Sequence, residues 1–87
     1  AYYLYEAEFI RMGYGCLRRD EKEKAVAVFL TTARLFPQSA NAWDSLGEAQ
    51  LAIGQQEAAI ASYKKSLELD PENQNARDVL MGLGVAL

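Results

Sequence analysis

The residues best placed to do chemistry in this chain are carboxylates four residues apart, such as Asp44 and Glu48, which a helix would bring to one face. Paired carboxylates can serve as general acid and base. The 87 residues include no histidine, which removes the usual general base, the usual zinc ligand and any histidine-activated nucleophile. No glycine-rich phosphate loop, metal-spaced cluster or dinucleotide fingerprint accompanies the pair. We expect solvated helix charges here, with no catalytic residue, metal or cofactor.

The overall composition excludes several further classes of function. A formal net charge of −3 argues against nucleic acid or an acidic membrane surface as the partner. The longest apolar run, Ala25–Leu30, is far shorter than the ~20 residues of a membrane span. Cys16 is the only cysteine and is expected to be a small buried residue. It is compatible with the cytoplasm but assigns no compartment. Because the chain does not begin with Met, we expect it to be a fragment of a longer protein.

The elements that position these residues form an internal repeat of 34 residues. Shifting the sequence by 34 aligns identical residues: Gly13 with Gly47, Leu17 with Leu51, Ala25 with Ala59, Ala27 with Ala61, Leu35 with Leu69, and Pro37 with Pro71. Similar residues also align: Phe9 with Trp43, Met12 with Leu46, and Phe29 with Tyr63. The matches fall at apolar, small and turn positions, where a shared fold constrains the residue type.

Helical periodicity predicts an all-α fold of five helices at about 3–18, 21–35, 40–53, 56–69 and 74–85. Gly54 is expected to end one helix in the left-handed conformation, and Pro71 to follow the end of another. Ser39 and Asn73 are predicted N-caps, and Asp20 with Glu23 reads as a capping pair. No segment alternates in the manner of a strand.

These residues resemble the tetratricopeptide repeat family. The second copy, 40–73, carries Trp43, Leu46, Gly47, Ala59, Tyr63, Ser66 and Pro71 at family positions, and departs from the pattern at Gln50, where an aromatic is usual. The first copy, 6–39, is weaker, with Phe9, Gly13, Ala25, Phe29 and Pro37. Residues 74–85 resemble the closing helix. The resemblance implies one domain of antiparallel helix hairpins stacked as a short right-handed superhelix, with the first helices lining its concave side.

The resemblance also implies a non-catalytic scaffold that binds a protein or peptide segment on the concave face. The candidate residues are Ile10, Arg11, Tyr14, Leu17 and Arg18 of the first copy, Asn41, Asp44, Ser45 and Glu48 of the second, and Asp78 of the last helix, with Ala7, Ala52, Asn75 and Val79 beside them. Arginines lie at one end and carboxylates at the other, so the acidic end should prefer a basic segment. Solvated helix faces are the alternative interpretation.

The two ends of the chain suggest a further contact. The last helix shows almost no polar side and contains Gly82 and Gly84, which weaken a helix. The candidates for self-association, or for contact with an upstream domain, are Tyr2, Tyr3, Tyr5, Leu80, Met81, Leu83 and Leu87. In the alternative, these residues fold back on their own core. A structural dimerisation module is therefore a separate hypothesis from a peptide-binding scaffold.

A second alternative concerns a parent protein. The run from Phe36 to Ala49 looks like tetratricopeptide tails found after bacterial serine-hydrolase domains of the β-lactamase-like or esterase kind. The chain would then be the C-terminal accessory or oligomerisation segment of an enzyme. Ser45 and Asp44 would still not be catalytic, because no base or oxyanion element accompanies them. A Ser-x-x-Lys or Gly-x-Ser-x-Gly motif upstream would favour this hypothesis.

One subclass of the family clamps the C-terminal carboxylate of heat-shock chaperones with Lys and Asn. The corresponding positions here are Ile10, Tyr14, Ser45 and Val79, none of which can supply that clamp. We therefore predict that chaperone tails ending in acidic motifs do not bind. Isothermal titration calorimetry checks this, and micromolar binding of such a peptide would contradict it.

Overall fold

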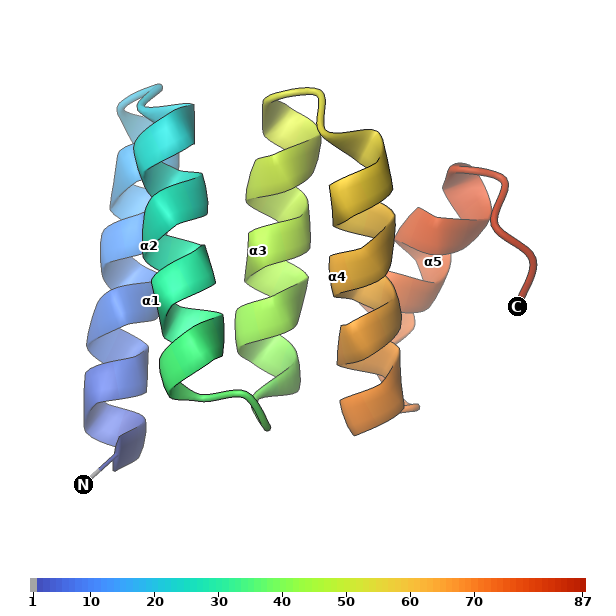
Figure 1. Ribbon diagram of the computed structural model, residues 1–87, viewed down its shortest axis with the longest axis horizontal. Coiled ribbons are helices and arrows are strands. Elements are labelled where there is room, and N and C mark those ends of the chain that lie inside the picture. Colours follow the sequence, from blue (N-terminus) through green and yellow to red (C-terminus); the bar gives the residue numbers. More distant parts are fainter. Residues whose placement is uncertain (1) are drawn as a thin grey trace.

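The computed structural model describes residues 2–87, and their side chains from residue 5 onward. It contains α1 (Tyr2–Arg18), α2 (Lys22–Leu35), α3 (Ala40–Ala52), α4 (Gln56–Leu69) and α5 (Gln74–Gly82). Figure 1 shows the helices in chain order as successive antiparallel neighbours, with α1 and α2 at one end and α5 at the other. The predicted all-α fold is confirmed. None of the described helices has the length and apolarity to cross a membrane.

The predicted caps that rest on side chains are confirmed at two helix starts. Ser39 Oγ accepts a hydrogen bond from the Ala42 amide at 3.1 Å, and Asn73 Oδ1 accepts one from the Ala76 amide at 3.2 Å. Each cap satisfies an amide that the first turn of a helix leaves without a backbone partner. The chain therefore enters α3 and α5 at defined residues.

Gly54 ends the second hairpin's first helix as predicted, with a φ of 79°. The Gln55 amide donates to the Gln50 carbonyl at 2.9 Å, and the Gly54 amide donates to the Leu51 carbonyl at 3.0 Å. These two bonds form a Schellman motif, which needs a left-handed residue that glycine adopts without steric cost.

The predicted capping pair of Asp20 and Glu23 is wrong. The residue before α2 is Glu21, and no side chain caps this helix. Asp20 instead has a φ of 62° and occupies the left-handed position that Gly54 occupies 34 residues later. The Glu21 amide donates to the Cys16 carbonyl at 2.8 Å, as the equivalent amide does in the second hairpin. The short polar side chain of Asp tolerates this conformation better than most residues do.

The last helix is shorter and more amphipathic than the sequence suggested. It ends at Gly82 rather than residue 85, because Gly84 (φ 82°) turns the chain and the Val85 amide bonds to the Leu80 carbonyl at 2.9 Å. Ala76 and Leu80 are fully buried, whereas Arg77 and Asp78 face solvent. The expectation of a helix without a polar side is therefore wrong.

Close approach of the two helices in each hairpin defines the core. A Cβ on Gly47 would lie 2.7 Å from Cε2 of Tyr63, and one on Gly13 would overlap the Phe29 ring. Both aromatic side chains are buried, at 2% and 0% exposure. Around them lie two clusters, one of Cys16, Ala25, Phe29, Ala33, Ala42, Leu46 and Ala49, the other of Ala59, Tyr63, Ala76 and Leu80. The burial of Cys16 confirms its predicted role.

Gln50, the departure from the family pattern, has a structural role of its own. Ser62 Oγ donates a hydrogen bond of 2.6 Å to Gln50 Oε1 and so joins α3 to α4. The neighbouring Leu51 packs against the second cluster. A polar bond and an adjacent leucine thus stand where an aromatic side chain is usual.

These contacts predict opposite effects for two glycine-to-alanine changes. Gly47→Ala forces a methyl group into the Tyr63 ring and should destabilise the fold by about 1–3 kcal/mol. Gly82→Ala meets no atom within 4 Å and should stabilise α5 by up to about 1 kcal/mol through helix propensity. Chemical denaturation followed by circular dichroism measures both. Equal stability of the two variants would contradict the steric argument.

Candidate partner-binding site

The face formed by α1, α3 and α5, here called the first-helix face, is held together by hydrogen bonds between these helices. Tyr14 Oη on α1 donates to Glu48 Oε1 on α3 at 3.0 Å and lies 3.0 Å from Ser45 Oγ. Because the phenol has one proton, Ser45 is the donor in its bond to Tyr14. The edge of the Tyr14 ring meets Phe29, with centroids 5.1 Å apart. Tyr14 is thus fixed between the core and the face.

Asp44 links α3 to the start of α5. Its carboxylate accepts hydrogen bonds from Asn73 Nδ2 at 2.8 Å and from Asn75 Nδ2 at 3.0 Å. Asn73 also donates to Ser66 Oγ at 2.8 Å, and Ser66 donates to the Ala40 carbonyl at 2.8 Å. Neutral amides therefore hold the Asp44 carboxylate in place without neutralising its charge.

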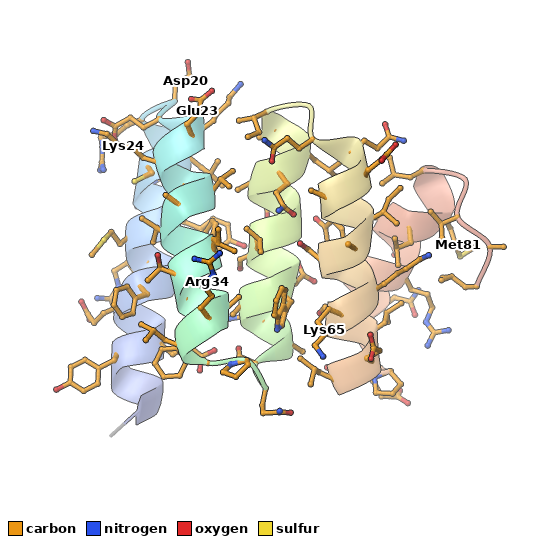
Figure 2. The ribbon with its side chains drawn as sticks, in the orientation of Figure 1. Asp20, Glu23, Lys24, Arg34, Lys65 and Met81 are labelled. Carbon is orange, nitrogen blue, oxygen red and sulfur yellow. The ribbon has the colours of Figure 1, made fainter. Side chains whose placement is uncertain are left out.

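The ion pairs among the described side chains leave these carboxylates out. The ion pairs join Arg11 to Glu8, Arg19 to Glu21, Lys22 to Asp20, and Lys24 to Glu21. No ion pair in that part of the chain involves Asp44, Glu48 or Asp78, and Asp78 Oδ1 accepts only an amide bond of 2.7 Å, from Gln74. Figure 2 shows Asp20, Glu23 and Lys24 together at the α1–α2 end, far from α5.

The charges of these carboxylates affect the pKa values of two phenols, half-buried Tyr14 and buried Tyr63. Burial raises the pKa of Tyr14, and the charges of Glu48 and Asp44 raise it further, against a lowering by the bond from Ser45. Burial, then Asp44 and Glu48, likewise raise the pKa of Tyr63. A phenolate at either position would meet both desolvation and like charge. The α3 part of the first-helix face is therefore acidic.

A hollow of about 370 Å³ opens beside the acidic part, lined by Glu6, Ala7, Ile10, Arg11 and Asn41. Ile10 is half-buried and packs against the first core cluster, while the Arg11 guanidinium is held by Glu8 at 2.6 Å. The floor is therefore apolar and the rim polar. Glu6 was not among the predicted residues; it accepts a hydrogen bond from Ser39. No local pattern in the sequence marks Glu6 for this position.

The structure distributes the predicted binding residues unevenly. Ile10, Arg11 and Asn41 meet at the hollow, and Tyr14, Ser45 and Glu48 form one hydrogen-bonded group. Ser45 is 0% exposed and so supports Tyr14 instead of presenting its own surface. Leu17 packs against the first core cluster, and Arg18 and Asp78 are exposed. Asn73, predicted only as a cap, proves to be a partner of Asp44.

The predicted self-association residues also separate into groups. Tyr5, Met81 and Leu87 are exposed, at 65%, 62% and 60%. Leu80 is fully buried in the second core cluster, so its prediction as a surface residue is wrong. Leu83 is half-buried. The side chains of Tyr2 and Tyr3 lie outside those that the structure describes.

The raised pKa of Tyr63 predicts alkaline destabilisation. Below pH 10 the phenol is neutral in the folded and unfolded chains, and above pH 10 only the unfolded chain ionises readily, so stability falls as pH rises. At pH 11 the loss attributable to Tyr63 should be about 1 kcal/mol. Tyr63→Phe should abolish that share, which denaturation at pH 8 and pH 11 measures. An unchanged pH dependence in the variant would contradict the assignment.

Comparison with known proteins agrees with this architecture. The sequence profile of the tetratricopeptide repeat matches residues 40–73. The chain is 37% identical over 65 residues to Superkiller complex protein 3 of Homo sapiens, covering 75% of this chain and 4% of that protein. It is 34% identical over 65 residues to tetratricopeptide repeat protein 37 of Xenopus laevis, again 75% of this chain and 4% of the relative.

A further relative is the chloroplastic tetratricopeptide repeat domain-containing protein PYG7 of Arabidopsis thaliana, 30% identical over 66 residues, which are 76% of this chain and 22% of that protein. The chain thus spans only a small part of the relatives it matches. The helix hairpins, the matched repeat and these relatives agree. The chain belongs to the tetratricopeptide repeat family, whose repeats generally mediate protein–protein interactions and are typically non-catalytic.

Proposed function

We propose that this chain is a non-catalytic scaffold that binds a protein or peptide segment on the first-helix face, and that it prefers a basic segment. The observation that carries the proposal is that three carboxylates of this one face, Asp44, Glu48 and Asp78, have no ion-pair partner among the described side chains. A positively charged segment would supply the missing charge and gain favourable long-range attraction during encounter.

The rigidity of the face also favours binding. Asp44 is positioned by two amides, and Glu48 by the phenol of Tyr14, which itself rests on Phe29. Groups that are already ordered lose little conformational entropy when a ligand binds. Glu48 remains exposed, with one carboxylate oxygen free of described hydrogen bonds. It is therefore the carboxylate best placed to meet a cation.

Binding of basic and acidic peptides tests the proposal. We expect an oligolysine peptide to shift the backbone NMR signals of α1 and α3, and an oligoglutamate peptide of equal length to leave them unchanged. Glu48→Gln keeps the acceptor for Tyr14 and removes the charge, so oligolysine binding should weaken about two- to fivefold, as expected for an exposed ion pair. Added salt should weaken binding to the unaltered chain.

The matched control is Glu68→Gln, which removes an exposed carboxylate of α4 and the same unit of net charge. It should change the affinity far less than Glu48→Gln does. Equal losses in the two variants would show that oligolysine responds to the net charge alone. Shifts confined to α2 and α4 would place binding on the opposite side and contradict the proposal.

A further inference from the structure

Comparison of the α3–α5 contact with the α1–α3 contact reveals one amide without a partner. Asn75 in α5 donates to both carboxylate oxygens of Asp44, at 3.0 and 3.2 Å. Thirty-four residues earlier, the equivalent amide is Asn41 and the equivalent of Asp44 is Ile10. Among the described residues, no hydrogen bond holds the Asn41 side chain. The same repeat position thus carries a hydrogen-bonded amide in α5 and, among the described residues, an amide without a partner in α3.

The hollow lies where Ile10 stands at the position equivalent to Asp44. Ile10 and Asn41 both line it, together with Ala7, the paired Arg11, and Glu6, which accepts a hydrogen bond from Ser39. In the second copy, the Asp44–Asn75 bond spans the equivalent position between α3 and α5. In the first copy, the side chain of Ile10 cannot accept a hydrogen bond from the Asn41 amide. The apolar floor of the hollow therefore stays open, and the donors and the acceptor of the Asn41 amide stay free.

We propose that this hollow is an anchor subsite for one apolar side chain of a bound extended segment, and that the Asn41 amide pairs with the backbone of the anchored residue. An amide offers both a donor and an acceptor, which matches a peptide unit. The floor of Ala7 and Ile10 suits an aliphatic side chain, and the Arg11 stem can extend it while its guanidinium stays with Glu8. The inference rests on the proposed function.

The geometry also fixes where the basic residue of that segment lies. Asn41 and Glu48 are seven residues apart on α3, about 10 Å along the helix axis. An extended segment covers about 3.3 Å per residue, so the apolar and basic residues should be about three positions apart. We therefore assign the partner as a segment with an aliphatic residue at the hollow and Lys or Arg about three residues away, facing Glu48.

Selection from a phage-displayed library of random heptapeptides tests this assignment. We expect enrichment of aliphatic-x-x-basic sequences or their reverse, with NMR shifts from the selected peptides at residues 7–11, 41 and 48. Ile10→Asp restores the arrangement of the second copy and should close the hollow, so the aliphatic preference should disappear while the basic preference remains. Circular dichroism checks that this variant folds, because Ile10 packs partly against the core.

Asn41→Ala provides a second variant at an exposed position where folding is not at stake. It should weaken binding of a selected peptide at least fivefold, whereas the control Gln56→Ala, exposed at the start of α4, should leave it unchanged. Enrichment of basic peptides with no aliphatic position, or unchanged binding by Asn41→Ala, overturns this inference and leaves the proposed function standing. No enrichment, or shifts away from the first-helix face, overturns both.

Discussion

The contact between a helix glycine and a buried aromatic ring is the constraint on which the structure depends. Gly13 against Phe29 and Gly47 against Tyr63 set the distance between the helices of each hairpin, because any Cβ there would enter the ring. One of these rings also supports the site: Phe29 packs against Tyr14, and Tyr14 donates a hydrogen bond to Glu48. The steric requirement at Gly13 and the position of the Glu48 carboxylate are therefore linked through the pair of Phe29 and Tyr14.

The candidate site lies where the two copies differ. Several positions shared by both copies, such as the glycines with their facing aromatic rings and Ala25 with Ala59, form the core. Ile10 replaces the equivalent of Asp44, which leaves Asn41 without the partner that Asn75 has. Met81 likewise stands in α5 where the other copies have glycine, and its side chain is exposed.

Most of the fold was predictable because its signals are local. The 34-residue period and the helical spacing predicted the number of helices. Ser39 and Asn73 cap the helices that follow them, and Gly54 ends the helix before it, each through backbone groups within one turn. The errors arose where two local signals compete. Asp is a common N-cap residue, but Asp20 adopts the left-handed conformation instead. In α5, the apolar residues continue to Leu87, but the chain turns at Gly84 and the helix ends at Gly82.

The sequence by itself determined the family, the helices and the sign of the charge on the candidate face. Only the tertiary structure decided that Ser45 and Leu80 are buried, that Asp44 is held by two amides, and that Glu6 lines the hollow. The physical reason is that helix periodicity assigns a residue to one side of its own helix. Contacts between α1, α3 and α5 depend on how far apart these helices lie and how each is rotated, which the packing of large side chains against small ones sets.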